Sequence, residues 1–515
     1  MQHTHTEGAV MKLDGVSLTL RDVIKVARHK CQVELTEASK AQVIRSRDYV
    51  NKLLQDKKVV YGLTTGFGKF SDTYISNDDT KALQVNLIRS HACGVGAPLS
   101  EEVVRAIMLL RLNALSRGNS GIRLELLETI TAMLNQNVIP VIPEKGSLGA
   151  SGDLAPLSHF ALVIMGEGEA YYEGKRMGGL EAMTLAGIKP IALEAKEGLA
   201  LINGTQVMTA IGSIACWDAL NLSKWADCIG ALTYEALLGV RDAFDPETHE
   251  LRPHKYQQVV ANNLIQLTQG SKLITRQGEV RVQDAYSLRC LPQVHGASRD
   301  ALAYIAEKLE IEINSVTDNP IIFADKDRVI SGGNFHGQPI ALSMDFMSIA
   351  MSEYANISER RVERLVNPQL NEKLPAFLVK DGGVQSGFMI AQYAAAALVS
   401  ENKSLAHPAS VDSIPSSANQ EDHVSMGTIG ARKAAQIVDN AYHVLAIELL
   451  CAAQAIDFRD PSLLGIGTSW VYNRCRQHVA QVTEDRVLST DFATIANMMK
   501  DSNVLNELSS IINLQ

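Results

Sequence analysis

Four long segments rich in Ala, Leu and Met constrain the fold of this chain more than any other feature of its sequence. Read as helices, residues 205–240, 338–366, 384–405 and 429–458 are apolar on nearly every face. A helix of roughly 30 residues is about 45 Å long. A helix that is apolar all round must be covered by other helices or by partner subunits. The segments therefore predict a mainly α protein with a long central helical bundle, and a homo-oligomer.

The first 204 residues have a different character and predict a smaller, mixed α/β region that precedes a helical region over residues 205–515. Apolar alternation, capping residues and turn residues are the local signals here. They predict a strand at 17–20, a helix from Thr36 to about Lys57, a helix opened by Ser100, and a small hairpin at 169–179.

Composition excludes several classes of protein and site. The net charge of −9 argues against a nucleic-acid partner and favours a small-molecule ligand. The seven cysteines are scattered without a C-x-x-C pair, so they predict neither a disulfide framework nor a metal site. Residues 1–10 lack the features of a secretory signal, and polar residues interrupt the apolar runs elsewhere. We therefore expect a cytoplasmic protein with no membrane segment.

Two glycine-containing stretches look like common catalytic motifs but fail their requirements. Residues 61–69 resemble a phosphate-binding loop, which would need Gly and Ser or Thr where this chain has Leu63 and Phe70. Residues 149–153 resemble a nucleophile elbow, which would need Gly in place of Asp153 and a preceding strand. Neither phosphate binding nor serine hydrolysis is predicted.

The segment from Ser147 to Pro156, Ser-Leu-Gly-Ala-Ser-Gly-Asp-Leu-Ala-Pro, joins small residues to an Asp cap and a proline in the first helical turn. By itself it predicts only a loop that leads into a helix. Four further segments accompany it: Leu201-Ile-Asn-Gly-Thr-Gln206, Gln283-Asp-Ala-Tyr-Ser-Leu-Arg289, Gly332-Gly-Asn-Phe-His-Gly337 and Asn419-Gln-Glu-Asp-His-Val-Ser-Met426. Together with the stretch that begins at Tyr61, these segments resemble the aromatic amino acid ammonia-lyases over nearly the whole chain after residue 50.

The resemblance implies a fumarase/aspartase-like helical bundle and a prosthetic group made from the chain itself. In that family, Ala-Ser-Gly cyclises to 4-methylideneimidazole-5-one, which here would arise from Ala150, Ser151 and Gly152 with no external cofactor. The nitrogen of Gly152 would attack the carbonyl of Ala150, two waters would leave, and Ser151 would become a 2,3-didehydroalanine. Small residues suit the sharp backbone turn that this reaction needs.

Two positions indicate which ring the substrate carries. Ser90-His91 resembles the histidine-type members, whereas tyrosine and phenylalanine relatives tend to carry His-Leu or Phe-Leu there. Glu421 also resembles the histidine branch, and a carboxylate suits a basic imidazole better than a benzene ring. The resemblance therefore implies a lyase that converts L-histidine to trans-urocanate and ammonia, the first step of histidine degradation.

The remaining site residues follow from the same resemblance. Tyr61 would be the base, and Arg289 would bind the substrate carboxylate. Asn203, Gln283 and Tyr286 would orient the carboxylate and the ring, and Phe335 would shape the cavity. His91 and Glu421 would hold the imidazole. The family also implies a homotetramer whose active sites are shared between subunits.

Other interpretations fit the same residues. Arg289 could be an ordinary ion-pairing arginine, and Tyr61 and Phe335 could be core aromatics. A tyrosine or phenylalanine ammonia-lyase, or the related 2,3-aminomutase, would share the electrophile and differ in the ring pocket. A catalytically silent helical scaffold would keep the fold without the chemistry.

Overall fold

The computed structural model describes residues 10–56, 58, 65 and 80–515. The chain divides into two compact units, each discontinuous in sequence. The first unit comprises residues 1–214, 306–345 and 408–432, and the second comprises residues 215–305, 346–407 and 433–515. The sequence-based boundary between residues 204 and 205 stays a prediction.

The first unit combines short helices with small sheets. Its helices are α1 (Leu20–Ala27), α2 (Glu37–Gln55), α3 (Thr80–His91), α4 (Glu101–Ser116), α5 (Leu124–Asn135), α6 (Leu154–Ile164), α7 (Gly179–Leu185) and α8 (Glu197–Ile202). Its strands are β1 (Met11–Leu13), β2 (Val33–Leu35), β3 (Val95–Pro98), β4 (Ile139–Pro140), β5 (Pro143–Lys145), β6 (Glu169–Tyr172), β7 (Lys175–Gly178), β8 (Ile321–Phe323) and β9 (Arg328–Ile330). The mixed character predicted for this part of the chain is confirmed.

The strands pair locally. β1 and β2 are parallel, with Met11 opposite Val33, while β3–β5 and β8–β9 are antiparallel pairs. β4, β6 and β7 form a three-stranded antiparallel sheet. Its β6–β7 hairpin is the one predicted around residues 169–179.

Four long helices contribute residues to both units: α9 (Gln206–Ala236), α13 (Leu291–Glu312), α14 (Gln338–Val366) and α16 (Gly427–Asp457). The second unit also contains α10 (Pro246–Glu250), α11 (Lys255–Leu267), α12 (Tyr286–Arg289), α15 (Met389–Leu405), α17 (Ile466–His478), α18 (Ser489–Lys500) and α19 (Val504–Ser509). Short 3-10 turns lie at Arg241–Phe244, Ala324–Lys326, Ala376–Leu378, Ser417–Asn419 and Pro461–Leu463. The mainly α prediction is confirmed.

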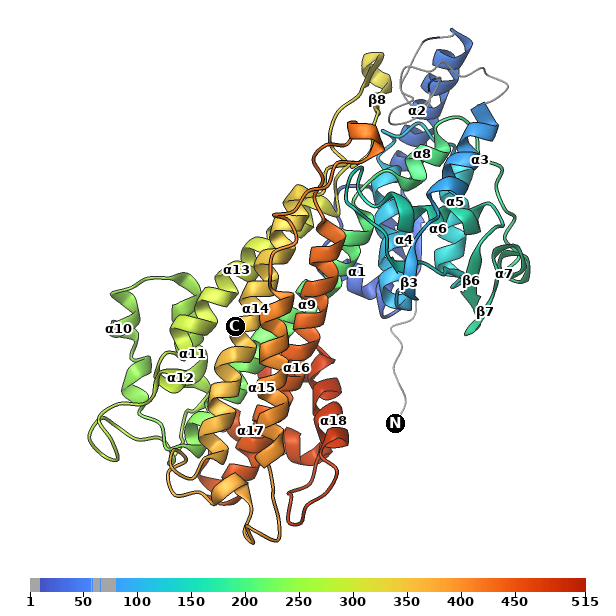
Figure 1. Ribbon diagram of the computed structural model, residues 1–515. Helices are drawn as coiled ribbons and strands as arrows, with labels where there is room; N and C mark the ends of the chain where they lie inside the picture. The colour runs from blue at the N-terminus through green and yellow to red at the C-terminus, as the bar shows by residue number, and fades with distance from the viewer. Residues whose placement is uncertain (1–9, 57, 59–64, 66–79) are drawn as a thin grey trace. The chain divides into compact units, whose positions relative to one another are not determined.

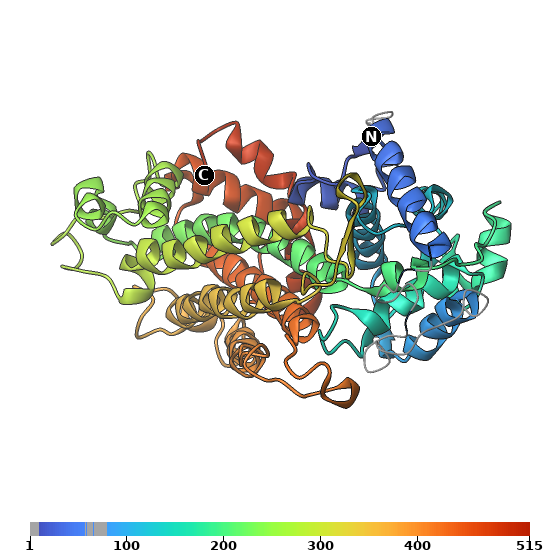
Figure 2. The ribbon, with the colours of Figure 1, turned by 90° about the horizontal axis from the view of Figure 1, so that it is seen from above.

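The long helices lie side by side within the second unit (Figures 1 and 2). Glu448 of α16 joins three of them, because its carboxylate accepts hydrogen bonds from Thr233 of α9 and from Ser358 and Arg361 of α14. A buried carboxylate needs such partners, since an unpaired charge in an apolar core is strongly destabilising. Among the described residues, no helix has both the length and the apolar character needed to cross a membrane.

Candidate functional site

The loop from Ser147 to Asp153 connects β5 to α6 and turns sharply at its glycines. Gly149 and Gly152 have φ values of +73° and +74°. A Cβ at Gly152 would lie 2.1 Å from the carbonyl oxygen of Gly204, and one at Gly149 would lie 2.3 Å from Ser425 Oγ. Both the conformation and the close approach require glycine. The close approach of Gly204 and Ser425 therefore explains why this loop has glycine at positions 152 and 149.

The segment around Gly204 holds one side of the loop. The backbone N–H of Gly204 donates to the carbonyl oxygen of Ser151 at 3.2 Å, and the N–H of Asp153 donates to the carbonyl oxygen of Gly204 at 2.7 Å. These bonds form a short parallel bridge between Gly152 and Gly204. The carbonyl group of Ser151 thus has a defined donor.

A segment about 275 residues later in the chain holds the other side. Ser425 donates to the carbonyl oxygen of Gly149 through both its backbone N–H (3.4 Å) and its Oγ (3.2 Å). The N–H of Met426 donates to the carbonyl oxygen of Leu148 at 3.2 Å. The loop is therefore fixed from both sides by segments distant in sequence.

Asp153 ties these segments together. Its buried carboxylate accepts hydrogen bonds from Ser147 Oγ at 2.7 Å, from Thr428 Oγ1, and from the N–H groups of Val207 and Met208 at 2.9 Å each. Burial raises the pKa of Asp153, and these donors oppose that shift. The sequence predicted that Asp153 caps the helix that follows it. The structure shows no such side-chain cap on α6; the carboxylate instead caps the first turn of α9.

Glu421 lies against Ser151, the middle residue of the Ala150–Gly152 segment. Its Oε1 is 3.5 Å from Ser151 Oγ, at the outer limit of a hydrogen bond, and its Oε2 accepts from Ser416 Oγ at 3.1 Å. Backbone hydrogen bonds between Ser416 and Glu421 form an antiparallel bridge that fixes the position of this residue. The structure therefore brings together Ser151 and Glu421, which the sequence placed in one site.

His91 ends α3 and belongs to the same unit. Its Nδ1 is 3.0 Å from Ser90 Oγ, which itself donates to the carbonyl oxygen of Leu87 at 3.1 Å. The direction of the Ser90–His91 hydrogen bond depends on which ring nitrogen of His91 carries the proton. Burial lowers the pKa of His91, and the negative charge of Glu421 opposes that shift. A neutral imidazole at pH 7 follows.

Asn203 and Phe335 also lie in the first unit. Asn203 is buried, and its Nδ2 donates to Asp318 Oδ1 at 3.3 Å and to the carbonyl oxygen of Asn319 at 3.1 Å. Phe335 is half-buried in the turn before α14. Two residues later, a Cβ at Gly337 would lie 2.9 Å from Ser425 Oγ, which places this turn beside the loop's Ser425 contact.

The predicted carboxylate-binding residues belong to the second unit. The guanidinium of Arg289 stacks over the ring of Tyr286 at 4.6 Å, and its Nε donates to the carbonyl oxygen of Asp284 at 2.9 Å. Gln283 precedes α12 and is not helical, so it shares no helix face with Tyr286. The Tyr286 side chain is 72% exposed. Tyr61, the predicted base, lies outside the described residues.

Sequence reasoning missed a layer of buried charge behind Asn203. Arg111 of α4 donates from Nη1 to the carbonyl oxygen of Asn203 at 2.7 Å. Lys196 and Asp318 form an ion pair at 2.7 Å that is almost completely buried. The available signal was Arg111 itself, because α4 is buried along nearly its whole length and a charged residue within such a helix needs a reason.

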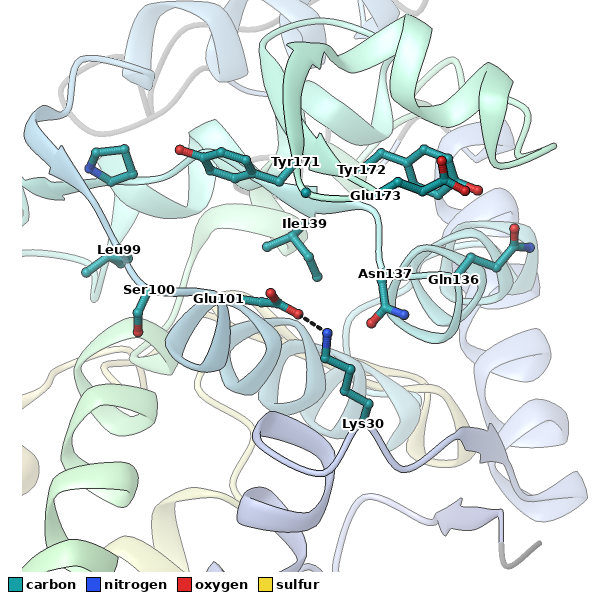
Figure 3. Close-up of a pocket in the computed structure, with 12 residues that line it drawn as sticks. Lys30, Leu99, Ser100, Glu101, Gln136, Asn137, Ile139, Tyr171, Tyr172 and Glu173 are labelled. Carbon is teal, nitrogen blue, oxygen red and sulfur yellow. Dashed lines mark ion pairs between the residues drawn. The ribbon is translucent and has the colours of Figure 1, made fainter. Parts of the chain in front are cut away.

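A cavity of about 730 Å³ lies elsewhere in the first unit (Figure 3). It lies beside the Tyr171–Tyr172 strand, and Lys30 forms an ion pair with Glu101 at 2.7 Å across it. None of the predicted site residues that the structure describes lines it. In the part of the chain that the structure describes, no three His, Cys, Asp or Glu side chains group as metal ligands would.

Comparison with known proteins identifies a family model and similar proteins that match nearly the whole chain. The family model for aromatic amino acid lyases matches residues 18–477. A histidine ammonia-lyase from Alkaliphilus oremlandii is 61% identical over 503 residues, which cover 98% of this chain and 99% of that protein.

Two solved structures share the fold. A histidine ammonia-lyase from Trypanosoma cruzi has a TM-score of 0.91 at 42% identity and covers 98% of this chain and 96% of its own. A tyrosine aminomutase from Streptomyces globisporus has a TM-score of 0.94 at 38% identity and covers 98% of this chain and 100% of its own. Since the family model spans most of the sequence and the relative from Alkaliphilus matches nearly all of it, the chain belongs to the aromatic amino acid lyase family.

Proposed function

We propose that this protein deaminates L-histidine to trans-urocanate and ammonia, the first step of histidine degradation. The relatives named histidine ammonia-lyase, at 55–61% identity, support this reaction. The fold alone does not select it, because a tyrosine aminomutase shares the fold. The observation that most favours histidine as the substrate is the position of the Glu421 carboxylate. It lies 3.5 Å from Ser151 Oγ and close enough to His91 to influence the pKa of that imidazole.

The residues at Ala150, Ser151 and Gly152 fit the self-made prosthetic ring of the family. The loop is sharply bent, a side chain at position 152 has no room, and Gly204 and Ser425 hold its backbone on both sides. When formed, 4-methylideneimidazole-5-one supplies an electrophilic carbon at the position of Ser151 that makes the substrate amine a better leaving group. No external cofactor is part of the proposal.

The chain's own side chains bind and orient the substrate. The carboxylate of Glu421 can accept the N–H of an imidazole, and the ring of His91 can form a hydrogen bond with the other ring nitrogen, whereas a phenyl ring offers neither group. Arg289 binds the substrate carboxylate through charge-assisted hydrogen bonds, with Gln283 and Tyr286 beside it in sequence. Tyr61 removes the β-proton, which requires its pKa to lie below the ordinary value of about 10.

The proposed assembly is a homotetramer in the cytoplasm with active sites shared between subunits. Support comes from apolar residues that remain exposed along the long helices. Leu342, Phe346 and Ile349 of α14 are 43–53% exposed and follow one another at spacings of four and three residues, which places them on one helix face. Ile390 and Tyr393 of α15 are also exposed. Such a stripe is typical of a subunit interface.

A substrate panel and an intact-mass measurement test the proposal. Purified protein is incubated with L-histidine, L-tyrosine and L-phenylalanine, and product absorption is followed. We expect turnover of histidine alone, and a chain two waters lighter than its sequence. Ser151→Ala should abolish turnover while leaving the fold intact. Ser158→Ala is the matched control, because the hydrogen bond that Ser158 Oγ donates to the carbonyl oxygen of Leu154 lies within α6.

Each contrary result points to a different alternative. Faster turnover of tyrosine than of histidine would place the chain with the tyrosine-specific lyases or aminomutases. A full-mass chain without turnover of any of the three would make it a silent scaffold.

A further inference from the structure

Arg111 is a buried cation whose charge the rest of the site does not explain. Its side chain is fully buried in α4, and only Nη1 has a hydrogen-bond partner among the described residues, the carbonyl oxygen of Asn203. Burial lowers the pKa of Arg111 to about 10, with the charge of Asp318 opposing the shift, so the guanidinium stays protonated at neutral pH. Burying such a charge is unfavourable, and a buried group without a partner calls for a physical reason.

One peptide group connects Arg111 to the loop. The carbonyl of Asn203 and the N–H of Gly204 belong to the same peptide unit. Arg111 Nη1 donates to the carbonyl end at 2.7 Å, and the N–H end donates to the carbonyl oxygen of Ser151 at 3.2 Å. A donor that carries charge polarises the peptide and strengthens the hydrogen bond at its other end. The positive charge of Arg111 therefore acts on the Ser151 carbonyl through a single peptide.

The Asn203–Gly204 peptide group is held in one orientation relative to the Ser151 carbonyl. Gly204 has a φ of +143°, and a Cβ there would lie 2.5 Å from Gln206 Oε1 and 2.6 Å from Thr317 Oγ1. Its own carbonyl oxygen accepts from Asp153 N–H at 2.7 Å. The side chain of Asn203 is anchored through Nδ2 to Asp318, which Lys196 holds in turn. Residues of the first compact unit therefore fix both ends of the Asn203–Gly204 peptide group.

We propose that Arg111 is a positioning residue for formation of the prosthetic ring, acting on the Ser151 carbonyl through the Asn203–Gly204 peptide. This inference rests on the proposed function. In ring formation the nitrogen of Gly152 bonds to the carbonyl carbon of Ala150, whose oxygen leaves as one water. Ser151 then loses its Cα proton and its hydroxyl as the second water, and no oxidant is needed. A strengthened donor at the Ser151 carbonyl makes that Cα proton more acidic and so favours the second loss.

The experiment compares two arginines of one helix. Arg111→Met removes the charge, and Arg111→Lys keeps a charge on a single donor nitrogen in place of the planar guanidinium. Arg105 supplies the control, because it is also buried in α4 and donates to backbone carbonyls, those of Val26 at 2.9 Å and Leu134 at 3.0 Å, away from the loop. Arg105→Met and Arg105→Lys therefore carry the same change in buried charge. Intact mass reports ring formation without any assay of activity.

We expect much of the purified Arg111→Met protein to remain at full mass or one water below it. Its kcat for histidine should fall about 100-fold, as when one preorganised donor is lost, while KM stays within about twofold. Arg111→Lys should be intermediate in both mass conversion and kcat. Both Arg105 variants should be two waters lighter, with kcat within about threefold of wild type when they fold.

The proposal is overturned if folded Arg111→Met loses both waters completely and keeps a kcat near that of wild type. If the Met variant does not fold, the intact mass and kcat of Arg111→Lys are compared with those of Arg105→Lys. The proposal is then overturned if Arg111→Lys loses both waters completely and keeps a kcat near that of Arg105→Lys. The wild-type chain is measured first, because wild type at full mass and without turnover overturns the proposed function itself. A wild type two waters lighter and active on histidine, beside an unaffected Arg111 variant, overturns this inference alone.

Discussion

Glu421 differs from glutamine by one charge and almost nothing in shape, so Glu421→Gln isolates what the carboxylate contributes. We expect kcat/KM for histidine to fall about 10- to 100-fold, because a hydrogen bond to a charged group contributes about 1.5–3 kcal/mol. Steady-state kinetics measure it. Glu144→Gln in β5 is the control, since Glu144 is also an acidic residue of the first unit and forms an ion pair with Arg432 at 3.0 Å. An unchanged kcat/KM in the Glu421 variant would remove this residue from imidazole binding.

At the residue scale, what the sequence could predict depended on whether a motif surrounded the residue. Ser151, His91 and Glu421 stand in recognisable segments, and the structure brings them into one unit. Arg111 and Lys196 stand in no motif, and their roles depend on Asn203 and Asp318, which lie about 90 to 120 residues away. A long-range contact of this kind leaves no local pattern, so only an unusual buried charge hinted at it.

At the scale of elements, the start of α9 depends on Asp153, a side chain of the loop that precedes α6. Asp153→Asn keeps the shape of the side chain but loses the charge that accepts two N–H groups of this first turn. We expect the variant to be less stable by about 1–3 kcal/mol, seen as a lower melting temperature in calorimetry. Asp460→Asn is the control, because Asp460 caps only an exposed 3-10 turn. A melting temperature as high as that of wild type would show that Val207 and Met208 do not need this carboxylate.

Helices and strands could be predicted from the sequence where the apolar pattern was long or where a capping residue directly preceded the helix. The helices predicted over 205–240, 338–366, 384–405 and 429–458 are present as α9, α14, α15 and α16. α14 has the predicted bounds, α9 and α15 are shorter than predicted, and α16 begins two residues earlier and ends one residue earlier. The strand predicted at 17–20 is wrong. Thr19 instead forms a capping box with Asp22 at the start of α1, so two apolar residues that suggested alternation flank a helix cap. Four residues are too few to distinguish the two-residue alternation of a strand from the start of a helix.

At the scale of the whole molecule, one buried carboxylate in α9 links stability to pH. Burial raises the pKa of Glu235 to about 7, from an ordinary value of 4.5, and its Oε1 accepts the N–H of Gly465 at 2.8 Å. The folded state therefore holds a proton that the unfolded chain releases near pH 4.5, so stability falls as pH rises from about 4.5 to about 7. Glu235→Gln should flatten this dependence and raise the melting temperature at pH 8. Equal differences between pH 6 and pH 8 in the two proteins would contradict it.

Assembly is tested at the same scale. Phe346→Glu places a charge in the exposed apolar stripe of α14, and we expect it to dissociate the proposed tetramer and to reduce activity with it. Light scattering and the histidine assay measure the two effects. Leu251→Glu is the control, because Leu251 is 89% exposed and lies outside α14 and α15. A fully active monomer would rule out shared active sites.

The two-sided support of the Ser147–Asp153 loop also sets an order in time. Its partners include Ser425 and Thr428, which the ribosome adds about 275 residues after the loop itself. The nascent chain cannot give the loop its final shape before then, because Ser425, Met426 and Thr428 have not been synthesised. A reactive electrophile made from this loop would therefore appear only on a chain that is nearly complete and whose loop has reached its folded shape.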